Sequence, residues 1–290
     1  MSGNHTTGEL LKAATAHLAA SGSEAAHLEA ELLLAHVLGR NRARLKSHPE
    51  ETADAAGAAL YQSLIARRAT GEPLAYLVGY KDFWTLRLAV TPAVLVPRPE
   101  TELVVERALS LRPDETARVV DLGTGSGAIA LALAHERPRW HVTGTDVSDE
   151  ALAVARANAA SLGLARVEWL HGRWFEPLAA RRFDLIVSNP PYIGADEPQL
   201  ARLGNEPRGA LSPGVDALEC LQVIVNAAPD HLEHGGWLVL EHGHRQAADL
   251  ARELVVRGFR HVRSHRDLAG HERASEGQWG PSDRSLGPLQ

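Results

Sequence analysis

A run of four residues after an apolar segment carries the most specific chemistry in the sequence. The apolar segment at 183–188 is typical of a buried strand, and it is followed by Asn189, Pro190, Pro191 and Tyr192. An amide nitrogen is a poor nucleophile because its lone pair is conjugated with the carbonyl, and the exocyclic amines of nucleobases share this problem. The Asn189 side-chain oxygen and the Pro190 carbonyl can orient such a nitrogen and accept its hydrogens as positive charge develops.

The prolines and the tyrosine of this run suit the same task. Each proline fixes its own φ and biases the preceding residue toward an extended conformation, which stiffens the loop. The Tyr192 ring offers a flat face on which a planar amide or base can stack. Transfer of a methyl group to such a nitrogen requires no general base, because the nitrogen can lose its proton after the methyl group has been transferred. We therefore predict that Asn189, Pro190 and Tyr192 are catalytic and that Pro191 also contacts the substrate; the alternative is a proline-rich turn with an asparagine cap.

A glycine-rich turn at 121–127, with the sequence DLGTGSG, follows an apolar run and precedes a helical pattern. Glycines permit positive φ and let a ligand approach the backbone where a Cβ would obstruct it. Dinucleotide-binding proteins use a related turn, but the spacing here is G-x-G-x-G, and Asp121 precedes the first glycine. This combination favours S-adenosylmethionine, which carries a sulfonium and no phosphate, over a turn that serves packing alone. The residues predicted to contact this cofactor here are Gly123, Thr124, Gly125, Ser126 and Gly127.

Two further residues are candidates for cofactor binding. Asp146 ends the next expected strand, about 20 residues after the glycine-rich turn, where an acid can accept both ribose hydroxyls. The alternative for Asp146 is an acid at a helix N-terminus beside Ser148. Trp174 follows another strand pattern and could pack against the adenine, although a lone Trp is equally typical of a core.

The composition limits the class of protein. The chain has 290 residues and a formal net charge of -6, so no global field draws it to nucleic acid or anionic lipid. Its single cysteine, Cys220, excludes an internal disulfide, indicates a reducing compartment and lies in an apolar helical pattern that predicts a buried thiol. No Cys/His cluster has metal-ligand spacing, so we expect no metal. Without a signal-peptide layout or an apolar run of about 20 residues, we expect a cytoplasmic protein that does not span a membrane.

The elements that must position these residues fall into distinct regions. Residues 8–70 have apolar residues at helical spacing, which predicts a small helical bundle. Residues 71–99 carry aromatic and β-branched residues with Gly and Pro, which indicates a connector that contains a hairpin. From residue 118 onward, strand and helix patterns alternate. Such alternation predicts a doubly wound, mostly parallel α/β sheet that binds ligands at the carboxyl ends of its strands.

The same patterns give expected boundaries. Strands are expected at 118–122, 141–146, 167–171, 183–188 and 237–241, and helices at 128–135 and 149–162. The expected domains are a helical N-terminal domain at 1–84, a connector at 85–116, a methyltransferase domain at 117–273 and a flexible tail at 274–290. The tail is expected because this stretch is rich in Gly, Ser, Pro and Asp.

Further stretches accompany these motifs along nearly the whole chain. Residues 67–83 read RRATGEPLAYLVGYKDF and residues 95–102 read LVPRPETE; LEHG at 240–243 and RDLAGHER at 266–273 follow the Asn-Pro-Pro-Tyr loop. Together with DLGTGSGAIALALA, TDVSDEALAVARANA and VSNPPYI, they resemble the HemK/PrmC family of protein-(glutamine-N5) methyltransferases. A glycine-rich turn is common to many methyltransferases, whereas PRPETE and NPPY behind a helical N-terminal domain are far more restrictive.

The resemblance implies a Rossmann-like methyltransferase domain preceded by a helical domain that helps to dock a peptide-chain release factor. It implies that the substrate is the glutamine of a Gly-Gly-Gln motif and that the products are N5-methylglutamine and S-adenosylhomocysteine. The family's cofactor contacts correspond to residues 123–127, Asp146, Trp174 and Asn189, and its substrate contacts correspond to residues 189–192. We expect a monomer with no direct nucleic-acid partner.

Two positions depart from the family's pattern. The family usually carries an acid just before the Trp after the fourth strand, and here that residue is Arg173. An Asp there could accept from the adenine amino group, which Arg cannot do. Asn205 precedes Glu206 and Pro207, where an aromatic residue is more usual. Neither departure touches the 189–192 loop.

Two other functions remain open on the sequence. An adenine-N6 methyltransferase acting on nucleic acid would use the same Asn-Pro-Pro-Tyr chemistry, but it must read and extrude its base. No extended basic, aromatic-containing insertion that would serve for this is present in the sequence. A non-catalytic binding protein on a methyltransferase fold is the other alternative, and the intact glycine-rich turn, Asp146 and Asn189 argue against it.

Overall fold

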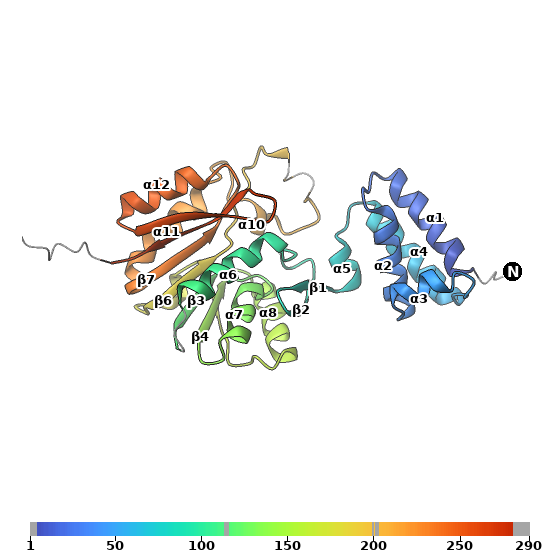
Figure 1. Cartoon of the computed structure of the whole chain (residues 1–290), viewed down its shortest axis with the longest axis horizontal. Helices are drawn as coiled ribbons and strands as arrows, with labels where there is room; N and C mark the ends of the chain where they lie inside the picture. The colour runs from blue at the N-terminus through green and yellow to red at the C-terminus, as the bar shows by residue number, and fades with distance from the viewer. Residues whose placement is uncertain (1–4, 113–115, 199, 201–202, 281–290) are drawn as a thin grey trace, which may run out of the picture. The chain divides into compact units, whose positions relative to one another are not determined.

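The computed structural model describes residues 5–112, 116–198, 200 and 203–280 (Figure 1). The chain divides into two compact units, Met1–Tyr80 and Lys81–Gln290. The first unit is helical, as expected, but it ends at Tyr80 and not at residue 84. The second unit contains the sheet.

The N-terminal unit is a helical bundle. Helix α1 begins at a capping box, in which the Thr6 side chain accepts from the Glu9 N–H and the Glu9 carboxylate accepts from the Thr6 N–H. Across the core, the Tyr61 hydroxyl donates to the Ala30 carbonyl at 3.0 Å. The apolar residues that recur at helical spacing are buried, among them Leu18, Leu33 and Leu34. The helices are α1 (Thr7–Ala20), α2 (Ala26–Leu38), α3 (Arg42–Ser47), α4 (Ala55–Ala69) and α5 (Leu74–Val78).

A two-stranded hairpin lies at the start of the second unit and is formed by β1 (Tyr80–Phe83) and β2 (Leu86–Ala89). In its turn, the Trp84 backbone N–H donates to Glu102 and the indole N–H donates to Glu136. These bonds tie the hairpin to the helices of the second unit. A domain boundary between residues 84 and 85 would therefore cut through the turn of the hairpin.

A seven-stranded sheet, in the order β5-β4-β3-β6-β7-β9-β8, forms the centre of the second unit. The strands from β5 to β7 pair in parallel, and β9 pairs antiparallel with both β7 and β8. This confirms the mostly parallel, doubly wound sheet. The strands are β3 (Arg118–Leu122), β4 (His141–Asp146), β5 (Glu168–His171), β6 (Phe183–Ser188), β7 (Leu232–Glu241), β8 (Arg260–Arg266) and β9 (Glu272–Gln278).

Helices cover both faces of this sheet (Figure 1). Successive strand residues point to opposite faces, so that Val119 belongs to the core under α6, α7 and α8, whereas Val120 belongs to the core under α11 and α12. The helices of this unit are α6 (Glu102–Leu111), α7 (Ala128–Glu136), α8 (Asp149–Ser161), α10 (Arg208–Leu211), α11 (Glu219–His231) and α12 (Ala247–Arg257), with 3-10 turns η1 (Pro99–Thr101) and η2 (Glu176–Leu178).

The prediction of a flexible tail at 274–290 is wrong for residues 274–278, because β9 runs to Gln278 between two partner strands. The polar residues of this strand are paired inside the structure. Ser275 forms a hydrogen bond with the His242 ring, and the Glu276 carboxylate accepts from Arg107. A composition rich in Ser and Gly is therefore compatible with a central strand here, because neighbouring strands and α6 satisfy its polar groups. Residues 281–290 lie outside the described residues.

Candidate functional site

The glycine-rich turn connects β3 to α7, and its geometry depends on glycine. The φ values of Gly123, Gly125 and Gly127 are 69°, 56° and 83°, which residues with a Cβ atom rarely adopt. A Cβ on Gly123 would lie 3.1 Å from the Trp174 ring, so the indole is packed against the bare backbone of the turn. Gly127 is the N-cap of α7. The turn therefore exposes backbone atoms beside an aromatic ring.

The two hydroxyl residues of this turn lie beneath it. The Thr124 hydroxyl donates to Asp121 at 2.6 Å, and the Ser126 carbonyl accepts from the Asn158 side chain at 2.9 Å. Both residues are buried, as is Asp121, and burial raises the pKa of the Asp121 carboxyl to about 7. Of the turn residues predicted to bind cofactor, Gly123 and Gly125 line a cavity, whereas Thr124, Ser126 and Gly127 support the turn from below.

Asp146 lies at the end of β4 and faces the same turn. One carboxylate oxygen accepts from the Gly125 N–H at 2.9 Å, and the other accepts from the Ser148 N–H at 2.9 Å. The side chain is half-buried and lines the cavity. Asp146 thus holds the glycine-rich turn and the Ser148 cap of α8 in place, and its remaining lone pairs are available to a ligand.

The cavity beside the glycine-rich turn, here called the glycine-loop cavity, has a volume of about 390 Å³. Its walls include Gly123, Gly125, Asp146, Trp174, Asn189 and Pro191. The Trp174 carbonyl accepts from the Thr145 hydroxyl at 3.0 Å, which fixes the backbone under the indole. Among the described residues, the indole N–H of Trp174 has no hydrogen-bond partner. Arg173 and Cys220 also line this cavity, and the burial expected for the Cys220 thiol is confirmed.

The Asn-Pro-Pro-Tyr loop leaves the sheet at the end of β6. The Ser188 hydroxyl donates to the Leu122 carbonyl at 2.6 Å and locks β6 beside β3 just before the loop begins. The side-chain N–H of Asn189 donates to the Thr101 hydroxyl at 3.1 Å. Because the Asn189 nitrogen makes this bond, the side-chain oxygen of Asn189 remains available to accept a hydrogen bond from a ligand.

A second cavity, called the Tyr192 cavity, has a volume of about 200 Å³ and is lined by Asn189, Pro190, Tyr192, Glu241, Arg98 and Arg273, among others. The Tyr192 hydroxyl donates to Glu241 at 2.9 Å. Glu241 is fully buried, and this burial raises the pKa of its carboxyl to about 7. Burial, together with the negative charge on Glu241, also raises the pKa of Tyr192, so the phenol stays protonated.

The two cavities meet at Asn189. This residue lines both of them, together with Leu95 and Ala210. At the carboxyl edge of the sheet, Asn189 therefore borders both a space bounded by the glycine-rich turn and a space bounded by Tyr192. Of the three shared residues, Asn189 alone has a polar side chain, so it is placed to orient a group in one cavity toward a group in the other.

Comparison with known proteins identifies the family. Residues 9–79 match the PrmC N-terminal domain and residues 100–203 match the methyltransferase small domain. A release factor glutamine methyltransferase from Pseudomonas aeruginosa is 48% identical over 259 residues, which cover 89% of this chain and 94% of that protein. The proteins of the same name from Bordetella pertussis (50% identity, 86% and 94% coverage) and Coxiella burnetii (44% identity, 87% and 91% coverage) agree. The chain belongs to the release factor glutamine methyltransferase family.

Solved structures support the methyltransferase fold of this family member. A methyltransferase from Pyrococcus furiosus matches with a TM-score of 0.53 and 21% identity, over 76% of this chain and 98% of that one. The catalytic domain of hMettl16 matches with a TM-score of 0.56 and 19% identity, over 78% of this chain and 84% of that one. At these identities the likeness concerns the fold. The predicted family, fold class and enzyme class are thus confirmed.

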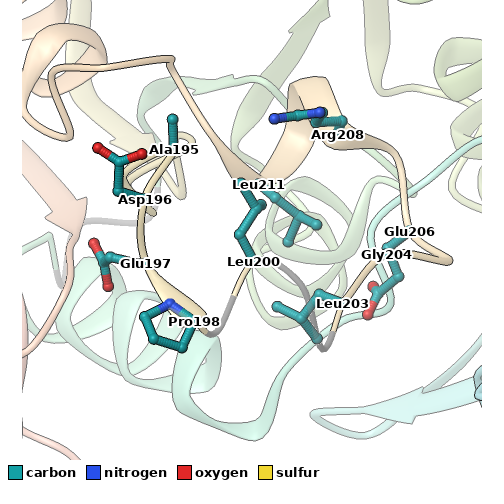
Figure 2. A pocket seen from close by; sticks show the side chains of 10 residues that line it. All are labelled: Ala195, Asp196, Glu197, Pro198, Leu200, Leu203, Gly204, Glu206, Arg208 and Leu211. Carbon is teal, nitrogen blue, oxygen red and sulfur yellow. The ribbon is translucent and has the colours of Figure 1, made fainter.

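A third cavity, called the leucine cavity, has a volume of about 440 Å³. Figure 2 shows Leu200, Leu203 and Leu211 among its lining side chains, with Asp196 and Glu197 together on one side. It adjoins the Tyr192 cavity, because Leu203 and Leu211 line both. The leucine cavity therefore extends the Tyr192 cavity along the segment that follows the Asn-Pro-Pro-Tyr loop.

Several site residues were not predicted as such from the sequence. Thr101 holds Asn189, Glu241 holds Tyr192, and Arg98 pairs with the buried Glu206 carboxylate beside the Tyr192 cavity. These residues lie in the LVPRPETE, LEHG and Glu-Pro stretches that carry the family resemblance. Their presence in those stretches was the available signal, but nothing in the sequence showed which side chains they contact.

Metal-binding clusters and membrane-spanning helices are both absent from the residues that the structure describes. Within the described residues, no group of three or more His, Cys, Asp or Glu side chains is arranged to hold a metal ion. No helix in that same part of the chain is both long and apolar enough to cross a membrane.

One glycine outside the turn controls the packing beneath the site. A Cβ on Gly144 of β4 would lie 2.6 Å from the Trp169 ring and 3.1 Å from the Thr124 hydroxyl. We expect Gly144→Ala to lower the free energy of unfolding by about 1–3 kcal/mol, because the added methyl overpacks a closed core. Urea denaturation measures this. Gly209→Ala is the control, because a Cβ there meets nothing within 4 Å, and an equal loss in both variants would contradict the packing argument.

Proposed function

We propose that this chain transfers a methyl group from S-adenosylmethionine to the N5 side-chain nitrogen of the glutamine in the Gly-Gly-Gln motif of peptide-chain release factors. Membership of the release factor glutamine methyltransferase family supports the substrate class. The position of Asn189 between the two cavities is the structural observation that carries the proposal. In this arrangement, the methyl donor occupies the glycine-loop cavity and the glutamine side chain occupies the Tyr192 cavity.

The glycine-loop cavity suits S-adenosylmethionine chemically. Gly125 leaves open space where a Cβ would intrude, Gly123 lets the Trp174 ring pack against the turn, and Asp146 offers carboxylate lone pairs to hydroxyl groups. When bound, the cofactor supplies an electrophilic methyl group on a sulfonium. Arg173 stands where the family usually has an acid, so we expect no carboxylate to accept from the adenine amino group at that position.

The Asn-Pro-Pro-Tyr loop orients the acceptor nitrogen. Thr101 takes the Asn189 N–H, so the Asn189 side-chain oxygen is free to accept one hydrogen of the glutamine amide, and the Pro190 carbonyl accepts the other. These contacts direct the nitrogen lone pair, which is otherwise conjugated, toward the methyl group. Glu241 holds the hydroxyl of Tyr192, which leaves the ring face for stacking on the planar amide. As the nitrogen bonds to the methyl carbon, the carbon–sulfur bond breaks with its electron pair on sulfur, which leaves S-adenosylhomocysteine; the nitrogen becomes cationic and then loses one proton to water.

The partner and the cellular context follow from this assignment. The helical N-terminal unit helps to dock the release factor, and the leucine cavity, which continues from the Tyr192 cavity, contacts residues next to the glutamine. The enzyme acts in the cytoplasm as a monomer and needs no metal and no nucleic acid.

Mass spectrometry tests the proposal most directly. The purified protein is incubated with S-adenosylmethionine and, in parallel, with a bacterial release factor and with duplex DNA. We expect one added methyl group on the glutamine of Gly-Gly-Gln and none on the DNA. Methylated adenine without methylated glutamine would replace the proposed substrate by a nucleic acid, and no methylation together with no S-adenosylmethionine binding would contradict an enzymatic role.

A further inference from the structure

Glu241 is a buried carboxyl group beside the acceptor loop, at the end of β7. Its side chain lines the Tyr192 cavity and is fully buried. One oxygen accepts from the Tyr192 hydroxyl at 2.9 Å, whereas no well-formed hydrogen bond reaches the other oxygen in the described part of the chain. A fully buried carboxyl with an unused oxygen is expensive to maintain in a fold, so its position next to the catalytic loop calls for a functional explanation.

The hydroxyl of Thr101 lies near both this carboxyl group and Asn189. Thr101 is buried, and its hydroxyl is close enough to Glu241 to lower the pKa of that carboxyl, although it forms no well-formed hydrogen bond with the unused oxygen. The same hydroxyl oxygen accepts from the Asn189 side-chain N–H at 3.1 Å. A hydroxyl carries one hydrogen and two lone pairs. When Thr101 gives its hydrogen to Glu241, it can only accept from Asn189, which fixes the orientation of the asparagine amide.

We propose that Glu241, in its ionised form, is a positioning residue that sets the direction of the hydrogen bonds from Asn189 through Thr101 and thereby holds the Asn189 side-chain oxygen toward the acceptor nitrogen. A carboxylate only accepts hydrogen bonds, so both Thr101 and Tyr192 must donate to it. This role rests on the proposed function, in which Asn189 accepts a hydrogen of the substrate amide. It adds a residue on β7 that does not itself contact the reacting atoms.

Protonation of Glu241 removes this constraint. A neutral carboxyl can donate to Thr101, which can then donate to the Asn189 oxygen, and the asparagine amide can rotate to present its N–H groups to the substrate nitrogen. Two facing donors repel one another, so this state binds the glutamine amide unproductively. The hydrogen bonds among Glu241, Thr101 and Asn189 can thus run in two orientations, of which one is active, and the charge on Glu241 determines which of the two forms.

The charged neighbours of Glu241 set the pH range of this switch. Burial is the largest influence on the pKa of this carboxyl; the nearby Thr101 hydroxyl, the bond from Tyr192 and the positive charge of Arg273 lower the pKa, the charge of Glu100 raises it, and together they place it at about 7. The carboxyl is therefore protonated below about pH 7 and ionised above it. Since the ionised form is the active one, kcat/KM for the release factor should rise with pH through about 7.

Glu241→Gln tests the role, because glutamine keeps the shape of the side chain but neither ionises nor accepts at both ends. We expect kcat/KM at pH 8.5 to fall about 10- to 100-fold, the rise through about pH 7 to disappear, and the Kd for S-adenosylmethionine to stay within about twofold. Glu276→Gln is the matched control. Glu276 is an equally buried carboxylate on neighbouring β9, paired with Arg107 and outside the network, so its variant should keep the rise.

Thr101 variants keep the proposal testable if Glu241→Gln fails to fold. Thr101→Val removes the connecting hydroxyl and should lower kcat about 10- to 100-fold, while Thr101→Ser, which retains the hydroxyl, should restore most of it. A wild-type pH profile and turnover in Glu241→Gln, or turnover within twofold of wild type in Thr101→Val, would overturn the role of Glu241. If the wild-type enzyme methylates only adenine, the proposed substrate fails, and the same profiles are then measured on the adenine amine that Asn189 would serve.

Discussion

Asn189→Ala is expected to lower kcat for release factor methylation by about 100-fold. The variant loses the side-chain oxygen that we propose accepts from the glutamine amide. It also loses the side-chain N–H that donates to the Thr101 hydroxyl at 3.1 Å. Pro190 and Tyr192 still bind the amide but cannot orient its lone pair alone. Single-turnover kinetics with saturating S-adenosylmethionine, followed by mass spectrometry of the Gly-Gly-Gln peptide, measures the effect.

Two controls separate a catalytic loss from a structural one in this variant. The Kd for S-adenosylmethionine should rise by no more than about fivefold, since Asn189 is only one of the side chains that line the glycine-loop cavity. Asn189→Asp keeps an acceptor oxygen in place but cannot donate to Thr101, so its kcat should lie between those of the wild type and Asn189→Ala. Turnover close to wild type in Asn189→Ala would exclude this residue as the acceptor of the amide hydrogen.

Asp146→Ala is expected to weaken S-adenosylmethionine binding by about 10- to 100-fold, which is about 1.4 to 2.8 kcal/mol. The carboxylate accepts from the Gly125 N–H and the Ser148 N–H, both at 2.9 Å, and its remaining lone pairs face the glycine-loop cavity. Its removal therefore loses the proposed bonds to the ribose hydroxyls and also loosens the glycine-rich turn. Isothermal titration calorimetry at constant pH gives the Kd directly.

Ser148→Ala provides the matched control for Asp146→Ala. The Ser148 hydroxyl accepts from the Ala151 N–H as the cap of α8, whereas Asp146 uses only the Ser148 backbone N–H, which alanine retains. This variant should remove the side-chain hydrogen bond that caps α8 without changing the Kd for S-adenosylmethionine by more than about twofold. If Asp146→Ala leaves the Kd unchanged, Asp146 serves the helix and the turn and has no part in holding the ribose.

Several features of the fold depend on short-range patterns, and the sequence predicted them accurately. The strands expected at 118–122, 141–146 and 183–188 are the observed β3, β4 and β6. β3 and β6 are rich in apolar residues, as buried parallel strands usually are, so their limits are visible without knowledge of their partners. The glycine-rich turn also follows from local chemistry, because its positive φ values require glycine at fixed spacing.

Other features depend on contacts between distant residues, and the sequence predicted them poorly. Residues 274–278 of β9 were expected to belong to a tail because the stretch 274–290 is rich in Gly, Ser, Pro and Asp. Their burial is explained only by the pairing of β9 with β7 and β8 and by its bonds to His242 and Arg107. In the same way, β7 begins at Leu232 and not at residue 237, because Leu232 pairs with Phe183 of β6 before a register shift that brings Trp237 opposite Leu185.

The residue types and their spacing were enough to predict the chemistry that we propose: a loop at 189–192 suited to orienting an amide, a glycine-rich turn followed by Asp146, and an order of motifs that points to one family. How the loop is held depends on contacts that only the folded chain shows. Thr101 lies 88 positions from Asn189, and Glu241 lies 49 positions from Tyr192. Side-chain contacts over such separations exist only because parallel strands bring their carboxyl ends to one edge of the sheet, and no local pattern encodes which of the polar residues gathered there will touch.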